Sequence, residues 1–283
     1  MQLVNINTTL PCLRLAIFGN ATLIDQNKFK NNSVYNYAAA GMRPEEFPAY
    51  LRFFKEENVN DIDVLFFGAD FREYFENDYG HMPPEHFISK VSMPGYRVKE
   101  ILSMSEVGMT LRSLEMKRTG YGIKHYEVGN VANHIRLPEL VVEDRISQGL
   151  EADSYENLVA DSEYESYIDA TIEAAGETQI IAFTTPISHF RTKLFFDQGK
   201  EVEYKDWLKL LIRKFGKVYH FSDLNAITRN HKKYYYDSYH TYPEVGYMIV
   251  DFIESEGEMK YENFGIILTS ENIDDYLQNI SKK

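Results

Sequence analysis

The residues best suited to chemistry are Asp237 and His240, which lie near the C-terminus just before Pro243. With two residues between them in a turn, the carboxylate can fold back onto the imidazole and stabilise the imidazolium that forms when the histidine takes a proton. The proline favours a helix starting directly after the pair. The spacing therefore predicts a general base with its orienting carboxylate. A turn aspartate that only caps backbone N–H groups beside an exposed histidine would have the same pattern.

Glycines follow the first three apolar runs of the chain, as Gly19-Asn20-Ala21, Gly41 and Gly68-Ala69-Asp70. Glycine is the usual residue where a turn needs positive φ, so each one alone is explained by turn geometry. Their joint placement, with Asp237 and His240 at the end of the chain, favours a functional interpretation. The turn after the first run is where a nucleophile would sit.

With these blocks in this order, the chain resembles the SGNH (GDSL-like) hydrolase family over almost its whole length. In that family the first strand ends in Gly-Asp-Ser or Gly-Asn-Ser, and Asp-x-x-His closes the C-terminus. The resemblance implies that position 21 holds the nucleophile, that His240 is the base and that Asp237 orients it. It also implies an oxyanion donor at Gly41, and we expect Asn20 to contact substrate.

The resemblance is closer to bacterial SGNH-like proteins whose third strand ends in Gly-x-Asp and which are associated with envelope polysaccharide. Residues 183–189, ending in His189, and Trp207 also fit that subgroup. His189 follows a predicted strand at the edge where open sheets bind ligands, so it is a candidate substrate contact. The implied activity is a serine esterase or O-acyltransferase acting on an acyl ester, most simply an acetyl ester, of a carbohydrate, without a cofactor.

Ala21 departs from this pattern because a methyl group stands where the reaction needs an oxygen nucleophile. The chain as given is therefore expected to be inactive. Three explanations stay open: an engineered serine-to-alanine change, which we favour because the intact Asp/His pair suits a serine; a natural pseudoenzyme; or an alignment in which Thr22 or another hydroxyl acts. A rival function is a catalytically silent SGNH-fold protein that binds glycan or assists assembly.

Asp70 is the second departure, because it stands where the family has an oxyanion-binding asparagine. An ionised carboxylate accepts hydrogen bonds and would repel an oxyanion, whereas an asparagine donates. Asp70 could instead bind a substrate hydroxyl or pair with Arg72 or Arg43. It could donate only if burial raised its pKa enough to keep it protonated.

Five apolar runs bounded by turn residues predict buried strands, at 13–19, 34–40, 63–68, 179–184 and 218–221. Helical patterns alternate with them, at 44–55, 98–117, 155–175, 205–215 and 243–254. This alternation predicts an α/β fold with a doubly wound, mostly parallel five-stranded sheet. The resemblance implies the same SGNH or flavodoxin-like three-layer sandwich.

The interval from 72 to 177 is longer than one crossover helix requires, so it is expected to contain a helical insertion or lid between strands three and four. The whole chain, 1–283, is expected to form one SGNH-like domain. No G-x-G-x-x-G or G-x-x-x-x-G-K-[ST] loop occurs, which argues against a nucleotide-binding α/β protein.

A net charge of −13 disfavours binding to nucleic acid or to an anionic membrane surface. No run approaches the roughly 20 apolar residues of a membrane span, and the histidines show no metal-ligand spacing, so neither a span nor a metal is expected. The predicted partner is a small-molecule or glycan ester, with the oligomeric state left open. The chain as given is expected to be cytoplasmic; an envelope-associated location stays open if a signal or anchor was removed.

Overall fold

The computed structural model describes residues 13–18, 33–36, 42–57, 62–76, 83–101, 125–127, 130–132, 136–258 and 263–280, with isolated positions between 107 and 118 and residue 261. The strands are β1 Leu13–Phe18, β2 Ser33–Asn36, β3 Val64–Ala69, β4 His125–Glu127, β5 Asn130–Ala132, β6 Gln179–Thr184, β7 Lys217–His220 and β8 Ile266–Thr269. The α-helices are α1 Phe47–Glu57, α2 Pro84–Val91, α3 Tyr96–Ile101, α5 Glu139–Ala152, α6 Tyr164–Ala175, α7 His189–Asp197, α8 Glu201–Phe215, α9 Ala226–Arg229, α10 His231–Tyr234, α11 Pro243–Glu254 and α12 Ile273–Ile280. Two 3-10 turns are also described, η2 Pro44–Glu46 and η3 Phe71–Tyr74.

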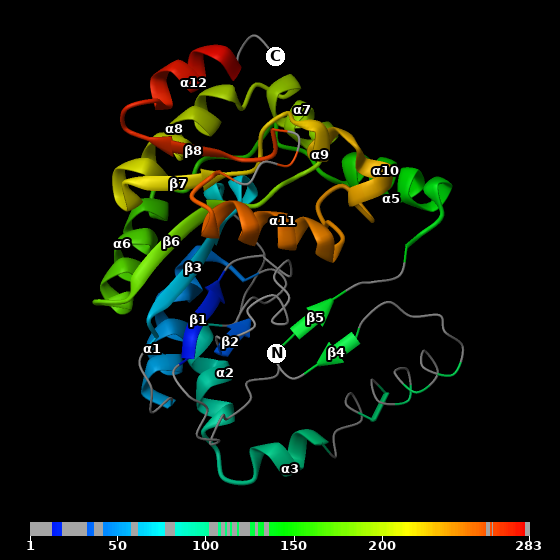
Figure 1. The fold of residues 1–283 in the computed structure, drawn as a ribbon. Helices are drawn as coiled ribbons and strands as arrows, with labels where there is room; N and C mark the ends of the chain where they lie inside the picture. The colour runs from blue at the N-terminus through cyan, green and yellow to red at the C-terminus, as the bar shows by residue number, and fades with distance from the viewer. Residues whose placement is uncertain are drawn as a thin grey trace.

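The protein has an α/β fold built on an open, mostly parallel sheet (Figure 1). The strands lie in the order β2-β1-β3-β6-β7-β8, and only β8 runs antiparallel to its neighbour. Within the described residues the sheet therefore has six strands and not the predicted five. The sixth, β8, is a short edge strand in which Leu268 is buried and the other three residues are partly buried. Its apolar run, Ile266 to Leu268, is shorter than each of the five runs that predicted strands.

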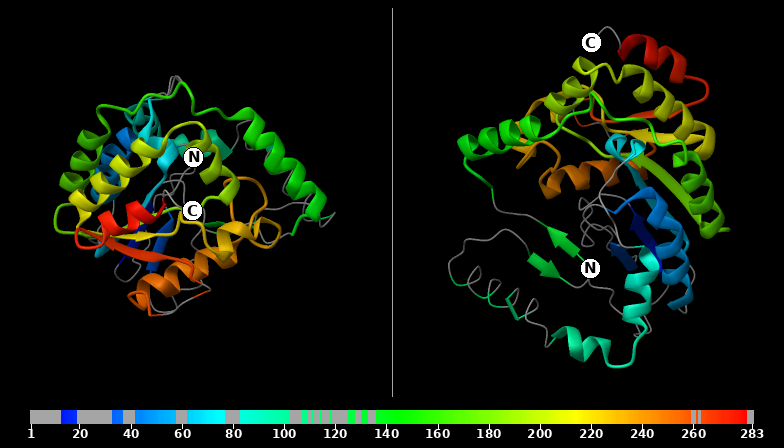
Figure 2. Two further views of the ribbon diagram at one scale, coloured as in Figure 1. Left: turned by 90° about the horizontal axis from the view of Figure 1, so that it is seen from above. Right: turned by 180° about the vertical axis from the view of Figure 1, so that it is seen from behind.

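Both faces of the sheet are covered, as the alternation of buried side chains along β3 shows. Leu65 and Phe67 pack into a core formed with α1, α6, α8 and α12, whereas Phe66 packs into a second core formed with α11. Figures 1 and 2 show these helices on opposite sides of the strands. A strand buried on both faces is typical of a parallel sheet.

The helix α1 shows how the sequence specifies one of these layers. Phe47, Tyr50, Leu51 and Phe54 are all buried and recur at the spacing of one helix face. The preceding turn has Pro44 at its first position, and the Glu46 side chain accepts a hydrogen bond from the backbone N–H of Arg43. This capping fixes where the chain enters the helix.

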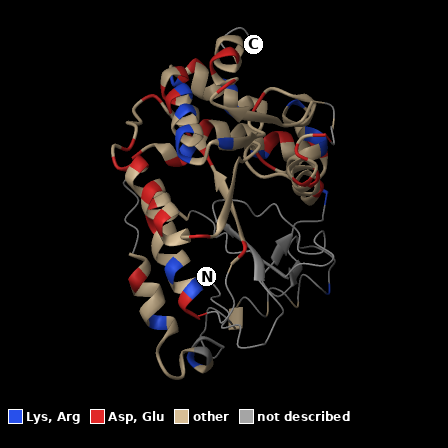
Figure 3. Cartoon of the chain, turned by 60° about the vertical axis from the view of Figure 1, so that its left-hand side comes forward, with Lys and Arg blue, Asp and Glu red and all other residues tan. Residues whose placement is uncertain are grey.

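The outer surfaces of α6 and α8 carry opposite charges that meet each other (Figure 3). Arg213 contacts Glu165 at 2.7 Å, and Lys214 contacts Asp169 at 2.7 Å. These exposed pairs contribute little stability individually. Glu165 and Asp169 therefore lie on an exposed face of α6.

Two predicted helices have different bounds from those expected. The helix predicted over 155–175 begins at Tyr164, because Ala160 forms a bridge with Phe75 and the Asp161 N–H donates to the Tyr74 carbonyl at 2.9 Å. That pairing holds the chain extended. The helix predicted over 98–117 is described as α3, which ends at Ile101, and most of the remainder lies outside the described residues.

The interval 72–177 is not uniformly helical. The strands β4 and β5 form a separate antiparallel pair (Figure 1). The last helix of the interval, α6, buries Ile168 and Ala175 in the core beneath the main sheet, so it belongs to that layer. Within the part of the chain that the structure describes, no helix is both long and apolar enough to cross a bilayer.

Candidate functional site

Asp237 and His240 lie at the tip of a tight turn between α10 and α11. The turn is closed by an antiparallel bridge between Tyr235 and Thr241, and the Tyr236 N–H donates to the His240 carbonyl at 3.1 Å. The chain then enters α11 through Pro243. Backbone pairing at the base of the turn thus fixes the two functional side chains at its tip.

The carboxylate of Asp237 folds back onto the imidazole of His240. The Asp237 Oδ2 accepts a hydrogen bond from His240 Nδ1 at 2.7 Å, while Oδ1 accepts from the backbone N–H groups of Tyr239 at 2.8 Å and His240 at 2.7 Å. Burial alone would raise the pKa of Asp237, but these bonds and the His240 charge outweigh it and lower the pKa. An ionised Asp237 on Nδ1 leaves Nε2 as the basic nitrogen.

The imidazole of His240 is partly exposed to solvent. Its side chain is 38 % exposed, and the ring of Tyr236 stacks on it at 5.3 Å with an angle of 11° between the planes. Among the described residues Nε2 has no hydrogen-bond partner, whereas Nδ1 is fully engaged by Asp237. This is the arrangement a general base requires.

Asp70 lies at the carboxyl edge of the same sheet, directly after β3. Its Oδ1 accepts from the Arg72 N–H at 2.9 Å, and its Oδ2 accepts from Thr185 Oγ1 at 3.3 Å. Burial raises the pKa of Asp70, and the two hydrogen bonds and the charge of Arg191 offset this only in part. With both oxygens accepting, Asp70 serves as a buried cap for the turn after β3 and is not paired with Arg43.

The turn and the sheet edge are joined by a buried polar cluster. Tyr239, which lies between Asp237 and His240 in the sequence, places its hydroxyl 2.8 Å from the hydroxyl of Tyr155. Arg191 donates to both hydroxyls, at 2.8 Å and 3.3 Å, and its charge acts on Asp70. The structure therefore brings Asp70 and the Asp237–His240 turn to one end of the sheet.

His189 occupies a different environment from the one predicted. As the first residue of α7, it donates from Nδ1 to the Thr228 carbonyl at 3.2 Å and packs against Phe190. Burial lowers the pKa of His189, and the bond to Thr228 offsets this only in part. Within the described residues these contacts tie the side chain to α9 and not to the Asp237–His240 turn, which indicates a structural role.

Asn20, Ala21 and Gly41, the other predicted site residues, lie outside the described residues. The strand before Asn20 and Ala21, β1, ends at Phe18, which pairs in register with Phe67 near the carboxyl end of β3. The predicted nucleophile position therefore follows a strand that runs parallel to β3 and ends near the same edge of the sheet.

Residues 136–155 wrap around the turn, a contact that the sequence pattern did not predict. Before α5, the Leu137 N–H donates to the Tyr242 hydroxyl at 3.0 Å, and the Arg136 guanidinium lies over the Tyr242 ring at 4.1 Å. Along α5, Glu143 binds Lys232 at 2.8 Å. Part of the predicted insertion thus packs against α10 and against the residue that precedes α11.

A signal for this packing was present in the glycine at position 149, inside a helical stretch. A helix-interior glycine costs helix stability and often marks a close approach of another chain segment. A Cβ at Gly149 would lie 2.7 Å from Ser238 Oγ, so α5 and the turn meet too closely for a side chain.

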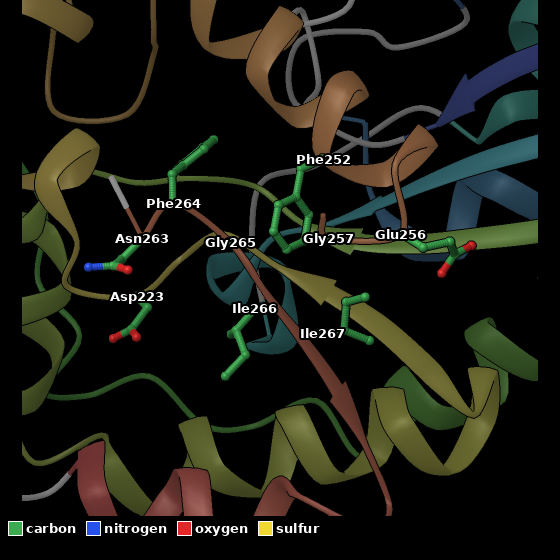
Figure 4. A pocket seen from close by; sticks show the side chains of 9 residues that line it. All are labelled: Asp223, Phe252, Glu256, Gly257, Asn263, Phe264, Gly265, Ile266 and Ile267. Carbon is green, nitrogen blue, oxygen red and sulfur yellow. The ribbon is translucent and has the colours of Figure 1, made fainter. Parts of the chain in front are cut away.

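A hollow of about 460 Å³ lies elsewhere, along β8 and the end of α11 (Figure 4). It is lined by residues of which none belongs to the turn, namely Asp223, Phe252, Glu256, Gly257, Asn263, Phe264, Gly265, Ile266 and Ile267. Figure 4 shows Asp223 and Glu256 on opposite sides of β8, and Glu256 is paired with Lys217 at 2.7 Å. Across the described ranges, no three His, Cys, Asp or Glu side chains converge as a metal site would require.

The chain was compared with models of known protein families and with curated proteins, and it matches none of them. The assignment of function consequently depends on the residues and on their geometry.

Proposed function

We propose that this chain has the architecture of an SGNH-type serine esterase or O-acyltransferase that acts on an acyl ester of a carbohydrate, with its nucleophile position occupied by Ala21. The observation that carries the proposal is the state of His240. Its Nδ1 is held 2.7 Å from the Asp237 carboxylate, while Nε2 is left without a partner among the described residues. As given, with Ala21, the chain is inactive in this reaction.

The chemistry follows from a serine at position 21. Its Oγ–H proton passes to His240 Nε2 as Oγ bonds to the carbonyl carbon of the ester, and Asp237 stabilises the imidazolium that results. The tetrahedral intermediate collapses, and the departing sugar oxygen takes the proton back from His240. The acyl group then passes from the serine to water or to a second sugar hydroxyl, which is activated by the same Nε2.

The fold supports this proposal in two ways. The parallel strands β2-β1-β3-β6-β7 have the order described for flavodoxin-like doubly wound sheets. Asp70 and the Asp237–His240 turn both lie at the carboxyl edge, where open α/β sheets bind ligands. The acetyl group and the carbohydrate come from the family resemblance alone.

The alternative, a catalytically silent SGNH-fold protein that binds glycan or assists assembly, is favoured by one observation, the alanine at position 21. On this alternative the sheet edge still binds a glycan, but no bond to an acyl group forms. Restoring the serine separates the two functions.

The test is hydrolysis of p-nitrophenyl acetate by the chain as given, by Ala21→Ser and by Ala21→Ser/His240→Ala. Turnover that appears only with the serine and disappears without His240 supports the esterase. No turnover by a folded Ala21→Ser protein, with this ester and with an O-acetylated glycan, contradicts the esterase and favours the silent binding protein.

A further inference from the structure

Arg191 on α7 is fully buried, although arginine is seldom buried without a specific reason. Its guanidinium contacts the turn through two hydrogen bonds, from Nη2 to Ser238 Oγ at 2.7 Å and from Nη1 to the Tyr239 hydroxyl at 2.8 Å. The Tyr239 ring lies 3.4 Å from the guanidinium carbon. Ser238 and Tyr239 are the two residues between Asp237 and His240.

The same two guanidinium nitrogens also contact the segment that wraps the turn. Nη1 pairs with the Asp153 carboxylate at 2.5 Å, and Nη2 donates to the Gly149 carbonyl at 3.2 Å. Gly149 lies in α5 and Asp153 directly follows it. One buried charge therefore joins α5 to the turn.

Gly149 supplies an independent geometric observation on the same contact. A Cβ there would lie 2.7 Å from Ser238 Oγ and 3.7 Å from Arg191 Nη2. Because α5 and the turn approach this closely, a methyl group at position 149 must displace Ser238 or the helix.

From these contacts we infer that Arg191 is a positioning residue that locks the Asp237–His240 turn against α5. Ser238 and Tyr239 are held at their side chains, so the backbone N–H groups of Tyr239 and His240 stay directed at Asp237 Oδ1. The planar guanidinium can serve both sides at once, which a lysine ammonium cannot do with the same geometry. The effect on catalysis rests on the proposed function, whereas the effect on the turn does not.

The turn is tested first in the chain as given, by amide hydrogen exchange of Tyr239 and His240 in the parent, Arg191→Lys and Gly149→Ala. We expect both amides to exchange at least about tenfold faster in each variant. With the contacts between Arg191, the turn and α5 weakened, local opening of the turn costs less free energy. The matched controls are Lys193→Gln, on the exposed side of α7, and Ser147→Ala, on the exposed side of α5. Both controls are expected to keep the parent rates.

Gly149→Ala also covers the case in which Arg191→Lys fails to fold, because it leaves the buried charge in place. Ser238→Ala removes the atom that the new Cβ would meet. Gly149→Ala/Ser238→Ala is therefore expected to exchange no faster than Ser238→Ala alone. Parent-like exchange of both amides in a folded Gly149→Ala chain overturns the inference.

The catalytic consequence is tested with the same substitutions in the Ala21→Ser chain. Loss of turn geometry is expected to lower kcat about tenfold to a hundredfold with KM little changed, because the interaction lost acts in the transition state. If Ala21→Ser shows no turnover at all, the proposed function fails while the exchange experiment still decides the role of Arg191. Faster exchange with kcat unchanged contradicts a positioning role in catalysis.

Discussion

Asp237 and Asp70 each begin a turn at the same edge of the sheet, yet their pKa values are shifted in opposite directions. In each, Oδ1 accepts a hydrogen bond from the backbone N–H two residues later, Tyr239 for Asp237 and Arg72 for Asp70. The second oxygen differs. In Asp237 it binds the His240 imidazole at 2.7 Å, and in Asp70 it accepts from the Thr185 hydroxyl at 3.3 Å.

The difference shows that burial and the partner of the second carboxylate oxygen together decide in which direction the pKa of an aspartate at this edge is shifted. The pKa of Asp237 is lowered, because the bonds and charge of His240 outweigh burial. The pKa of Asp70 is raised, because burial outweighs its two hydrogen bonds and the charges of Arg191 and Arg72. Asp237 is therefore suited to stabilise a cationic imidazole. Asp70 is shifted toward the protonated form, the only one that could donate to an oxyanion.

The largest effect is expected from Asp237→Asn in the Ala21→Ser chain. An asparagine amide facing Nδ1 favours the tautomer in which Nε2 carries the proton, so the base is lost while the turn is kept. We expect kcat for p-nitrophenyl acetate to fall by about 10³–10⁴-fold. The control is Asp197→Asn, an exposed residue of α7 paired with Lys193, which should leave kcat unchanged. A loss below tenfold would show that Asp237 does not set the tautomer.

The next largest effect is on the free energy of unfolding, which replacement by asparagine should change in opposite directions at Asp237 and Asp70. A lowered pKa means that Asp237 stabilises the fold above the pKa of an unfolded aspartate, and that this contribution is lost as pH falls through the folded value. Asp237→Asn should therefore cost about 2 kcal/mol at pH 7, since a bond to a charged group is removed. In urea unfolding at pH 7 and near pH 3, the difference in free energy of unfolding between Asp237→Asn and the parent should be smaller at the lower pH. A gap independent of pH would contradict the lowered pKa.

The parts of this arrangement that were predictable from sequence are those that depend on local pattern. The Asp237–His240 pair and the helix after it follow from spacing and from Pro243, and α1 follows from one apolar face. The edge strand β8 was missed, because its apolar run, Ile266 to Leu268, is only three residues long.

The setting of the pair could not be predicted, because it depends on residues distant in the chain. Arg191 and Gly149 lie 47 and 89 positions before Ser238, yet both meet it in the fold. Nothing near Arg191 in the sequence distinguishes a buried cation from an exposed one on a helix. Likewise, the shift at Asp70 depends on burial and on Thr185, which belongs to another strand end.

A smaller and opposite effect is expected from Asp70→Asn. A raised pKa means that protonated Asp70 stabilises the fold below the unfolded pKa, and that this contribution is lost as pH rises through the folded value. An asparagine does not ionise, so the variant should be more stable than the parent at pH 7 and should lose that gain near pH 4. The same unfolding series with Asp237→Asn provides the control, because as pH falls Asp237→Asn should gain stability relative to the parent, whereas Asp70→Asn should lose it. If Asp70→Asn and the parent had the same free energy of unfolding at both pH values, the pKa of Asp70 would not be raised and the two aspartates would not differ as described.

The smallest effect is expected from Thr185→Val, which deletes the hydroxyl that donates to Asp70 Oδ2 and keeps the shape of the buried side chain. The ionised carboxylate loses a donor, so the variant should cost about 0.5–1.5 kcal/mol at pH 7. The cost should shrink toward pH 4 as Asp70 becomes protonated, and it should be smaller in the Asp70→Asn chain. The matched control is Thr171→Val, a buried threonine that donates to the Tyr167 carbonyl at 2.8 Å, whose cost should not vary with pH. If Thr185→Val costs the same at both pH values and in both backgrounds, the hydroxyl does not act through the charge of Asp70, and burial alone separates the two aspartates.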